Sequence, residues 1–396
     1  MRRPRQAYAV GCLLLAVAAT PTVAAEPEKP ALSYEQAEDK AGFIALVRKA
    51  RKGDTESQWQ VGQAYVRLGE PARALPVLQS AAATGHPRAA ALVGALHEEA
   101  GGTAKNRDEA MRWYRLAAEQ GQPEAMAAFG RLLLQDRAPE ARESAWQWLR
   151  QAARLNDRDG QYHLGWLLAQ PGAAQDDAQA CQLFVKAAEQ GHVGAQVAAA
   201  SCLLAGRGAA RDRKAAADWL VRAAATQDPV ANYLLGRMQE AADESARIEA
   251  QKSYRTAATA GHREAQFALA TLLAKSRVEA DRKEAADWFA KAHQAGHKAA
   301  ANSLGQIYRD GAGVKQQTEK ARGYFKLAAD QDNANAMYNL AQMQNDGLGG
   351  ARDIDQALKW YVRAAEKGHE EAAAVVDGLL NSSVKTSALG LKGFWQ

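Results

Sequence analysis

Pairs of alanine residues recur along this 396-residue chain at an almost constant interval. Successive pairs lie 34 to 36 residues apart, and a period of this length, kept over many copies, is typical of helical hairpins that stack on one another. The pairs begin at Ala81, Ala117, Ala152, Ala187, Ala223, Ala257, Ala292 (Ala-His here), Ala328 and Ala364. The period therefore predicts one all-α solenoid of about nine repeats of 34–36 residues, and it overrides the two or three globular domains that the length alone would allow.

Each repeat contains two helices joined by a glycine-rich loop. The clearest copy reads Leu-Gly-Gln-Ile-Tyr-Arg-Asp-Gly-Ala-Gly-Val over 304–314 and Lys-Ala-Arg-Gly-Tyr-Phe-Lys-Leu-Ala-Ala over 320–329. Second helices end at the alanine pairs, and a lone helix of this second kind is expected around 43–52. First helices are expected near 57–68, 88–99, 123–135, 158–169, 193–205, 229–240, 263–275, 298–309, 334–345 and 370–380.

A small residue recurs at one position of the first helix, and two residues later the chain is apolar in every repeat. Glycine inside a helix costs about 1 kcal/mol relative to alanine, so its use at this position requires a packing reason. We expect a close approach of a neighbouring helix. The small residues are Gly62, Gly94, Gly130, Gly165, Ala200, Gly236, Ala270, Gly305 and Ala341.

Aromatic residues recur in the second helix, four positions before the alanine pair. They mark one helical face, and we expect them to be core residues rather than a ligand platform. They are Trp113, Trp148, Trp219, Trp288, Tyr324 and Trp360. Of the aromatic residues outside this pattern, Trp146 is expected to be buried, whereas Trp166 would serve as a partner anchor if it is exposed on a groove wall.

The N-terminus has the pattern of a secretory signal peptide over residues 1–25. Arg2, Arg3 and Arg5 precede an apolar run that is too short to span a bilayer, and small residues stand before Glu26. We therefore expect a periplasmic protein with a linker at 26–40, a solenoid at 41–380, a tail at 381–396 and no transmembrane segment once the signal is removed. The tail carries Phe394 and Trp395, which would dock on a partner or on the last repeat, or be disordered.

Three of the five units of net positive charge belong to this leader. The chain has 50 Lys and Arg against 45 Asp and Glu, a formal net charge of +5. Loss of three arginines with residues 1–25 leaves 47 basic residues and a net charge of +2. The basic balance is therefore no argument for a nucleic-acid partner.

Histidine and glycine are the residues that could suggest a metal or phosphate site. Five histidines stand in Gly-His pairs, one per repeat, whereas a metal site needs several ligands around one ion. The glycine-rich loops at 206–208, 311–313 and 347–350 join helix to helix and lack the strand that precedes a phosphate loop. We therefore assign these residues to turns and expect no catalytic, cofactor or metal site. The Gly-His histidines are His86, His192, His262, His297 and His369, and His97, His163 and His293 are isolated.

Two cysteines, Cys181 and Cys202, remain after removal of the signal. Both lie ten residues from the turn at Gly191-His192, which places them at equal height in an antiparallel pair of helices. In an oxidising compartment they are candidates for a disulfide. The alternative is a pair of buried thiols, because Cys202 occupies the apolar core position of its helix.

The motifs at 304–314 and 320–329 resemble Sel-one-like repeats (SLR), a branch of the tetratricopeptide-like superhelices. The resemblance extends over about residues 57–380, with degenerate copies near 71–86 and 139–157. It implies a right-handed α/α superhelix with a concave groove that acts as an adaptor in multiprotein assemblies, and it carries no catalytic motif. In exported bacterial members it is associated with envelope and secretion machinery.

We therefore expect an exported protein–protein interaction scaffold, not an enzyme, whose partners are envelope proteins in an exopolysaccharide, secretion or other cell-envelope assembly. The alternative is an envelope-acting hydrolase or β-lactam-binding protein, since some cysteine-rich members of the family have been linked to β-lactams. That function would require a nucleophile with a base and an oxyanion site, which the sequence does not show.

Overall fold

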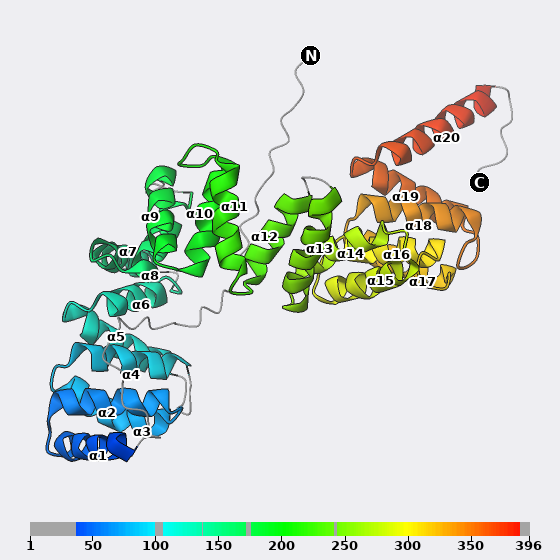
Figure 1. Ribbon diagram of the computed structural model, residues 1–396. Helices are drawn as coiled ribbons and strands as arrows, with labels where there is room; N and C mark the ends of the chain where they lie inside the picture. The colour runs from blue at the N-terminus through cyan, green and yellow to red at the C-terminus, as the bar shows by residue number, and fades with distance from the viewer. Residues whose placement is uncertain (1–36, 100–105, 137, 172–175, 241–243, 389–396) are drawn as a thin grey trace. The chain divides into compact units, whose positions relative to one another are not determined.

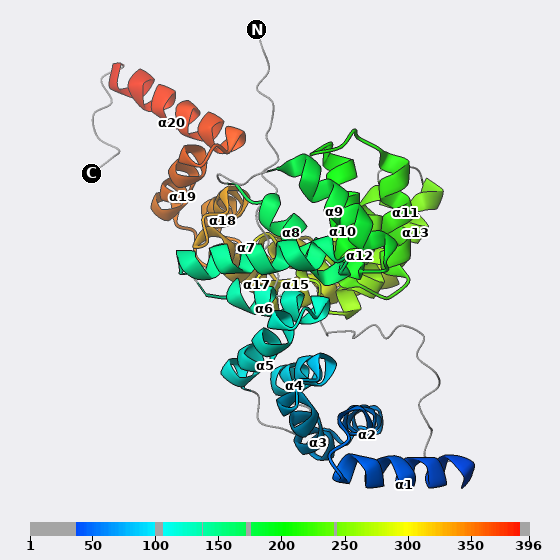
Figure 2. The ribbon, with the colours of Figure 1, turned by 90° about the vertical axis from the view of Figure 1, so that its left-hand side faces the viewer.

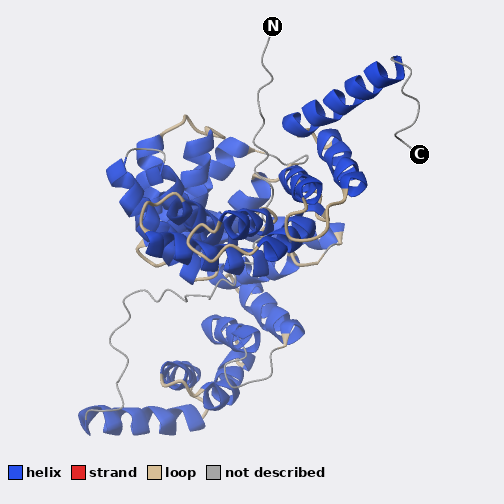
Figure 3. Cartoon of the chain, turned by 90° about the vertical axis from the view of Figure 1, so that its right-hand side faces the viewer, coloured by secondary structure: helices blue, strands red, loops and turns tan. Residues whose placement is uncertain are grey.

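The computed structural model describes residues 37–99, 106–136, 138–171, 176–240 and 244–388, and within these ranges the chain forms helices and connecting turns without a strand (Figure 3). The signal peptide at 1–25 and the Phe394-Trp395 pair lie outside the described residues. The chain divides into two compact units, Met1–Gln170 and Pro171–Gln396. Both are all-α solenoids of antiparallel helices, which confirms the predicted fold class.

In the first unit, each helix packs against the next along the chain, so that α2/α3, α4/α5 and α6/α7 form hairpins (Figures 1 and 2). The lone helix α1 precedes these hairpins, and the first helix α8 follows them. The bounds are α1 Ala37–Arg51, α2 Thr55–Arg67, α3 Pro71–Ala83, α4 Pro87–Glu99, α5 Arg107–Glu119, α6 Pro123–Leu133, α7 Pro139–Arg154 and α8 Arg158–Leu168.

In the second unit, α9 packs against α10, and five hairpins follow from α10/α11 to α18/α19. The helix α20 reaches Ala388, so residues 381–388 of the proposed tail are helical. The bounds are α9 Asp177–Glu189, α10 Val193–Ala205, α11 Arg213–Ala224, α12 Pro229–Glu240, α13 Glu244–Thr259, α14 Arg263–Ala274, α15 Glu279–Gln294, α16 Ala300–Asp310, α17 Thr318–Ala329, α18 Ala334–Asp346, α19 Ile354–Glu366 and α20 Glu370–Ala388.

The turn between hairpins ends the second helix with a left-handed residue. Gly85, for example, has φ +94°, its N–H donates to the Ala82 carbonyl, and the next N–H donates to the Ala81 carbonyl. This bonding satisfies the last carbonyls of the helix. Asn156 adopts the same left-handed conformation at φ 63° where its repeat lacks the glycine, which asparagine tolerates better than most residues do.

The small position of the first helix is small because a side chain of the second helix lies against it. A Cβ at Gly305 would fall 2.6 Å from the ring of Phe325, and one at Gly94 would fall 2.8 Å from the ring of Tyr114. The expected close approach is therefore confirmed at these glycines. The first alanine of every pair from Ala81 to Ala364 is fully buried, so the alanine period marks the centre of the helix stack.

The recurring tryptophans flank the core instead of filling it. Trp113, Trp148, Trp219 and Trp360 are half-buried, and Trp288 is the buried member. The more deeply buried side chains stand one residue later, because a step of one residue rotates a helix by about 100° and turns that position toward the first helix. They are Tyr114, Leu149, Leu220, Tyr254, Phe289, Phe325 and Tyr361. The expectation that the tryptophan position contributes to the core is confirmed for Trp288, and the other tryptophans pack against the core from its edge.

None of the helices in the described part of the chain is both long and apolar enough to cross a bilayer.

Candidate interaction surface

Four of the Gly-His histidines begin the first helix of a repeat by capping it. The Nδ1 atom of each ring accepts the backbone N–H three residues later, from Ala89, Ala195, Ala265 or Ala372, at 2.9–3.2 Å. These bonds satisfy an N–H group that the helix itself leaves unpaired. The assignment of these histidines to the turns between hairpins is thus confirmed, and it gains a specific role that the Gly-His dipeptide did not reveal. The capping histidines are His86, His192, His262 and His369.

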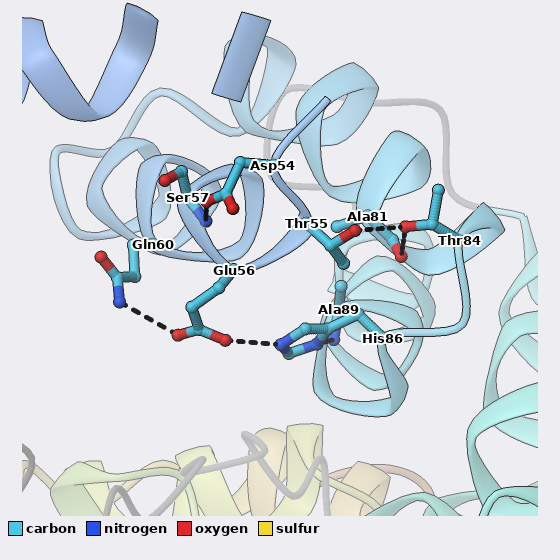
Figure 4. A network of polar contacts seen from close by, with 9 residues as sticks. All are labelled: Asp54, Thr55, Glu56, Ser57, Gln60, Ala81, Thr84, His86 and Ala89. Carbon is cyan, nitrogen blue, oxygen red and sulfur yellow. Dashed lines mark hydrogen bonds and ion pairs between the residues drawn. The ribbon is translucent and has the colours of Figure 1, made fainter. Parts of the chain in front are cut away.

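The rings of these turn histidines also bind the preceding repeat through an aromatic residue. His86 stacks on Trp59 with ring centroids 5.2 Å apart, and His262 stacks on Tyr233 at 4.8 Å. Phe267 and His297 stack at 4.0 Å, and Tyr338 and His369 at 4.4 Å. Figure 4 shows the His86 junction, where Nε2 also lies 3.3 Å from Glu56 Oε2. Each such ring therefore joins two consecutive first helices.

A sequence signal for this contact exists, although reading one Gly-His pair at a time misses it. Every Gly-His histidine is preceded, 27 to 31 residues earlier, by an aromatic residue at the fifth position after the preceding turn residue. Where the turn has Gln122, Asp157, Asp228 or Asn333 instead, the fifth position is not aromatic. The aromatic residues are Trp59, Tyr162, Tyr233, Phe267 and Tyr338, and the other repeats have Ala91, Ala127, Val197 and Asn302.

Buried amides join the first helix to the preceding second helix at several of the turns between hairpins, whether or not the turn has a histidine. Gln266 lies one turn inside α14, and its Nε2 donates to the Ala258 carbonyl at the end of α13, at 3.2 Å. Gln58 makes the same bond to the Ala50 carbonyl at 3.1 Å, and Asn232 to the Ala224 carbonyl at 3.3 Å. Since the donor stands at one position of the repeat, the junction is a repeated structural unit rather than a ligand site.

In the first unit, half-buried polar side chains of the first helices are held by hydrogen bonds to their neighbours. Arg131 Nη2 on α6 lies 2.7 Å from both carboxylate oxygens of Glu98 on α4, and the Tyr114 hydroxyl donates to Glu98 at 3.2 Å. Burial, followed by the Glu98 charge, raises the pKa of the adjacent Glu99. These contacts fix the charges of Glu98 and Arg131 in place.

Trp166 on α8 stands at the position that Arg131 occupies on α6, and it is 42% exposed. The indole therefore has the same register position on α8 as Arg131 has on α6. The sequence-based interpretation of Trp166 as a possible anchor depended on this exposure. Trp146 on α7 is half-buried, with the Arg150 guanidinium 4.8 Å from its ring centroid.

A second set of polar contacts joins α16 and α18 in the second unit. Asn339 Nδ2 donates to Asn302 Oδ1 at 3.1 Å, and Arg309 Nη1 donates to Asn339 Oδ1 at 3.2 Å. Arg309 also pairs with Asp310 through Nε at 2.7 Å. Both asparagines are buried, and their hydrogen bond joins two consecutive first helices, α16 and α18. Arg309 extends this contact to the partly exposed side chain of Asp310.

The glycine-rich loops pack on protein backbone. Gly313 has φ +77°, and a Cβ there would collide with the backbone of Arg282 and Lys283 at the start of α15. Gly208 lies in the same way against Asp177, and Gly349 against Thr318. These contacts confirm that the glycine-rich loops are structural turns of the hairpins. The loop backbone that would have to bind a phosphate already packs against the preceding repeat.

The structure brings Cys181 on α9 and Cys202 on α10 into hydrogen-bond contact as free thiols. Burial, reinforced by the Cys181 group, raises the pKa of Cys202 to about 12. A thiol with that pKa is protonated at neutral pH and is a poor nucleophile. The Cys202 thiol is therefore poorly suited to nucleophilic catalysis, and the disulfide itself stays a prediction.

The isolated histidines contact aromatic rings. His163 lies 5.0 Å from Tyr162, and His293 lies edge-on to Tyr324 at 6.0 Å between ring centroids. Both ring nitrogens of His97 are buried. Among the described residues, no three His, Cys, Asp or Glu side chains gather in a way that could hold a metal ion.

The Sel1 repeat model matches the chain in seven segments, four in one continuous run and three in a second run, and together they cover more than half of its length. They are residues 87–122, 123–157, 158–192, 193–225, 263–297, 298–333 and 334–369. The chain belongs to the Sel1 repeat family. The match includes 139–157, a copy that was expected to be degenerate, and it leaves out 226–262, where α12 and α13 nevertheless form a hairpin.

Solved structures with this fold align with the Sel1 repeat chain over long stretches. A protective antigen present in uropathogenic Escherichia coli strains is 23% identical, with 86% of this chain and 90% of that one covered and a TM-score of 0.50. A Sel1 repeat protein from Oxalobacter formigenes is 25% identical, with 59% and 91% covered and a TM-score of 0.49. No curated protein matches the chain.

Proposed function

We propose that this Sel1 repeat protein is an exported scaffold that binds envelope proteins along the exposed face of its first helices, with Trp166 as an anchor. Sel1 repeat proteins are generally protein-interaction scaffolds and not catalysts. Export is inferred from the arginines and the apolar run of residues 1–25, and a role in an exopolysaccharide or secretion assembly would follow from that compartment.

The observation that carries this proposal is the exposure of Trp166. An indole that is 42% exposed leaves a large apolar surface in water, which a binding partner could cover. Tryptophan is among the residues that most often dominate the binding energy of a protein interface. Arg131 on α6 and Glu98 on α4 add a bonded ion pair on the preceding first helices, and their mutual bonds mean that little side-chain freedom would be lost on binding.

Site-specific photo-cross-linking in cells tests the surface. A benzophenone amino acid is introduced at Trp166, and a matched control carries it at Val221, which is 55% exposed on the second helix α11. We expect position 166 to give a discrete cross-linked product of reproducible identity and position 221 to give none. Equal products from both positions, or none from either, would count against a partner on the first-helix face.

Export is tested separately by cell fractionation and N-terminal sequencing. The expected result is a periplasmic protein that begins at Glu26. A cytoplasmic protein that retains Met1 or Arg2 would remove the envelope context while leaving the binding surface open to the cross-linking test.

A further inference from the structure

His262 can cap α14 only while its ring is neutral. Its Nδ1 accepts the Ala265 N–H at 3.2 Å, so this nitrogen must present a lone pair rather than a proton. The ring is enclosed, with 6% of its side chain exposed, and it lies between the Tyr233 ring on α12 and the first turn of α14. A proton on Nδ1 would point toward the Ala265 N–H, so that two hydrogen-bond donors would face each other. It would also add positive charge at the N-terminus of α14, which already carries partial positive charge.

The charged groups around this ring do not outweigh its burial. Glu264 Oε2 lies 3.6 Å from Nδ1, but that carboxylate is already bound to Arg263 at 2.8 Å. Asp228 favours the charged ring and Arg263 opposes it, while α12 presents the uncharged Tyr233 and α13 contacts His262 through the Ala257 carbonyl. Burial is the largest influence, and it lowers the pKa of His262 below its ordinary value.

We propose that the junction at His262 is an acid-sensitive hinge of the second unit: protonation of the ring releases the cap of α14 and loosens hairpin α12/α13 from hairpin α14/α15. The same chain contains junctions without this property. Asn333 caps α18 with Oδ1 at 2.9 Å from the Ala336 N–H, and an asparagine does not titrate. The repeat therefore accepts either kind of cap, and of these two residues only the histidine titrates, so that the His262 junction depends on pH and the Asn333 junction does not.

The direction of the effect follows from the sign of the pKa shift. Because folding lowers the pKa of His262, the unfolded chain binds a proton more readily than the folded one. The histidine contributes in full above the unfolded pKa of about 6.5, and its contribution is lost as the pH falls through the lower folded pKa. The junction at α14 should consequently open in mildly acidic solution while Asn-capped junctions stay closed.

Residue-resolved amide exchange on the full chain at pH 7.5 and pH 5.0 tests the hinge. After correction for the intrinsic pH dependence of exchange, we expect the protection of the Ala265 amide to fall about five- to tenfold more than that of the Ala336 amide, since a lost N-cap has about this effect on helix opening. Equal changes at the two amides would overturn the proposal.

The variant H262N supplies the matched control, because it places the cap of Asn333 at the junction of α14. We expect it to keep the protection of Ala265 at pH 7.5 and to abolish the additional loss at pH 5.0. A variant that keeps the additional loss would contradict the hinge. If H262N does not fold, the comparison of Ala265 with Ala336 in the unaltered chain still decides. A loss of partner binding at pH 5.0 would be a consequence that rests on the proposed function, whereas the exchange measurement needs no partner.

Discussion

The ring of Phe325 lies against the backbone of Gly305, so that a Cβ on the glycine would fall 2.6 Å from the ring. This contact joins α16 to α17 at the centre of a hairpin. Equivalent contacts join Gly94 to Tyr114 and Gly236 to Tyr254, with 2.8 Å and 2.7 Å between the added Cβ and the ring. The glycine lets two helices approach more closely than alanine would allow, at a cost in helix propensity.

Substitution G305A should therefore destabilise the protein although alanine is the better helix former. The added methyl group must displace Phe325, and overpacking of this kind costs about 1–3 kcal/mol. The matched control is G323A, because Gly323 is also inside a helix but has nothing within 4 Å of its added Cβ. That variant should gain about 0.5–1 kcal/mol. Urea midpoints of the two variants should move in opposite directions, and a shift of the same sign would refute the packing explanation.

The N-cap residue of α8, Asp157, should contribute more to the stability of the protein in acid than at neutral pH. Asp157 caps α8, and burial raises its pKa to about 6. Because the folded pKa lies above the unfolded one, the contribution of this group is complete below about pH 4 and is lost as the pH rises through 6. Substitution D157N keeps an N-cap without the buried charge. It should stabilise the protein by about 1–2 kcal/mol at pH 7 and have little effect at pH 4.

The control for this prediction is D212N. Asp212 caps α11 through the Ala215 N–H at 2.9 Å, but it is exposed. Thermal unfolding of both variants between pH 4 and pH 7 should show a pH-dependent gain for D157N alone. A gain of similar size for D212N would mean that burial is not its cause.

The helices could be located from the sequence because alanine pairs and turn glycines recur in every repeat. The period identifies which positions are equivalent, but it does not say which of two adjacent positions faces the partner helix. For this reason the sequence indicated the core through Trp288 and its equivalents, whereas the more deeply buried side chains are Phe289 and its equivalents. The capping role of His262 was missed as well, since a Gly-His pair does not reveal where the ring points. Only its pairing with Tyr233, in the preceding repeat, carries that information.

The ion pair between Arg131 and Glu98 should matter more than an exposed pair of the same type. Its side chains are only 25% and 19% exposed, and removal of Arg131 leaves Glu98 beside Glu99 without its cation. Substitution R131A should cost about 2 kcal/mol. The control R112A removes the exposed partner of Glu109 and should cost about 0.3 kcal/mol. Equal losses of unfolding free energy in chemical denaturation would contradict the idea that partial burial strengthens the Arg131–Glu98 pair.

Cys181 and Cys202 should form a disulfide when the protein is isolated from an oxidising compartment. The bond forms as the two thiols lose two protons and two electrons to a disulfide oxidant, and the raised pKa of Cys202 should make this slow in air alone. Mass spectrometry after alkylation without reduction should find neither thiol modified and a mass two hydrogens below that of the reduced chain. Since the bond would close a loop of about 20 residues, reduction should lower the free energy of unfolding by about 3 kcal/mol. Two alkylated cysteines in periplasmic material would show that α9 and α10 hold a pair of buried thiols instead of a disulfide. In that case reductant should not change the urea midpoint of the unaltered chain. The double variant C181A/C202A is the control, because its urea midpoint should not respond to reductant in either case.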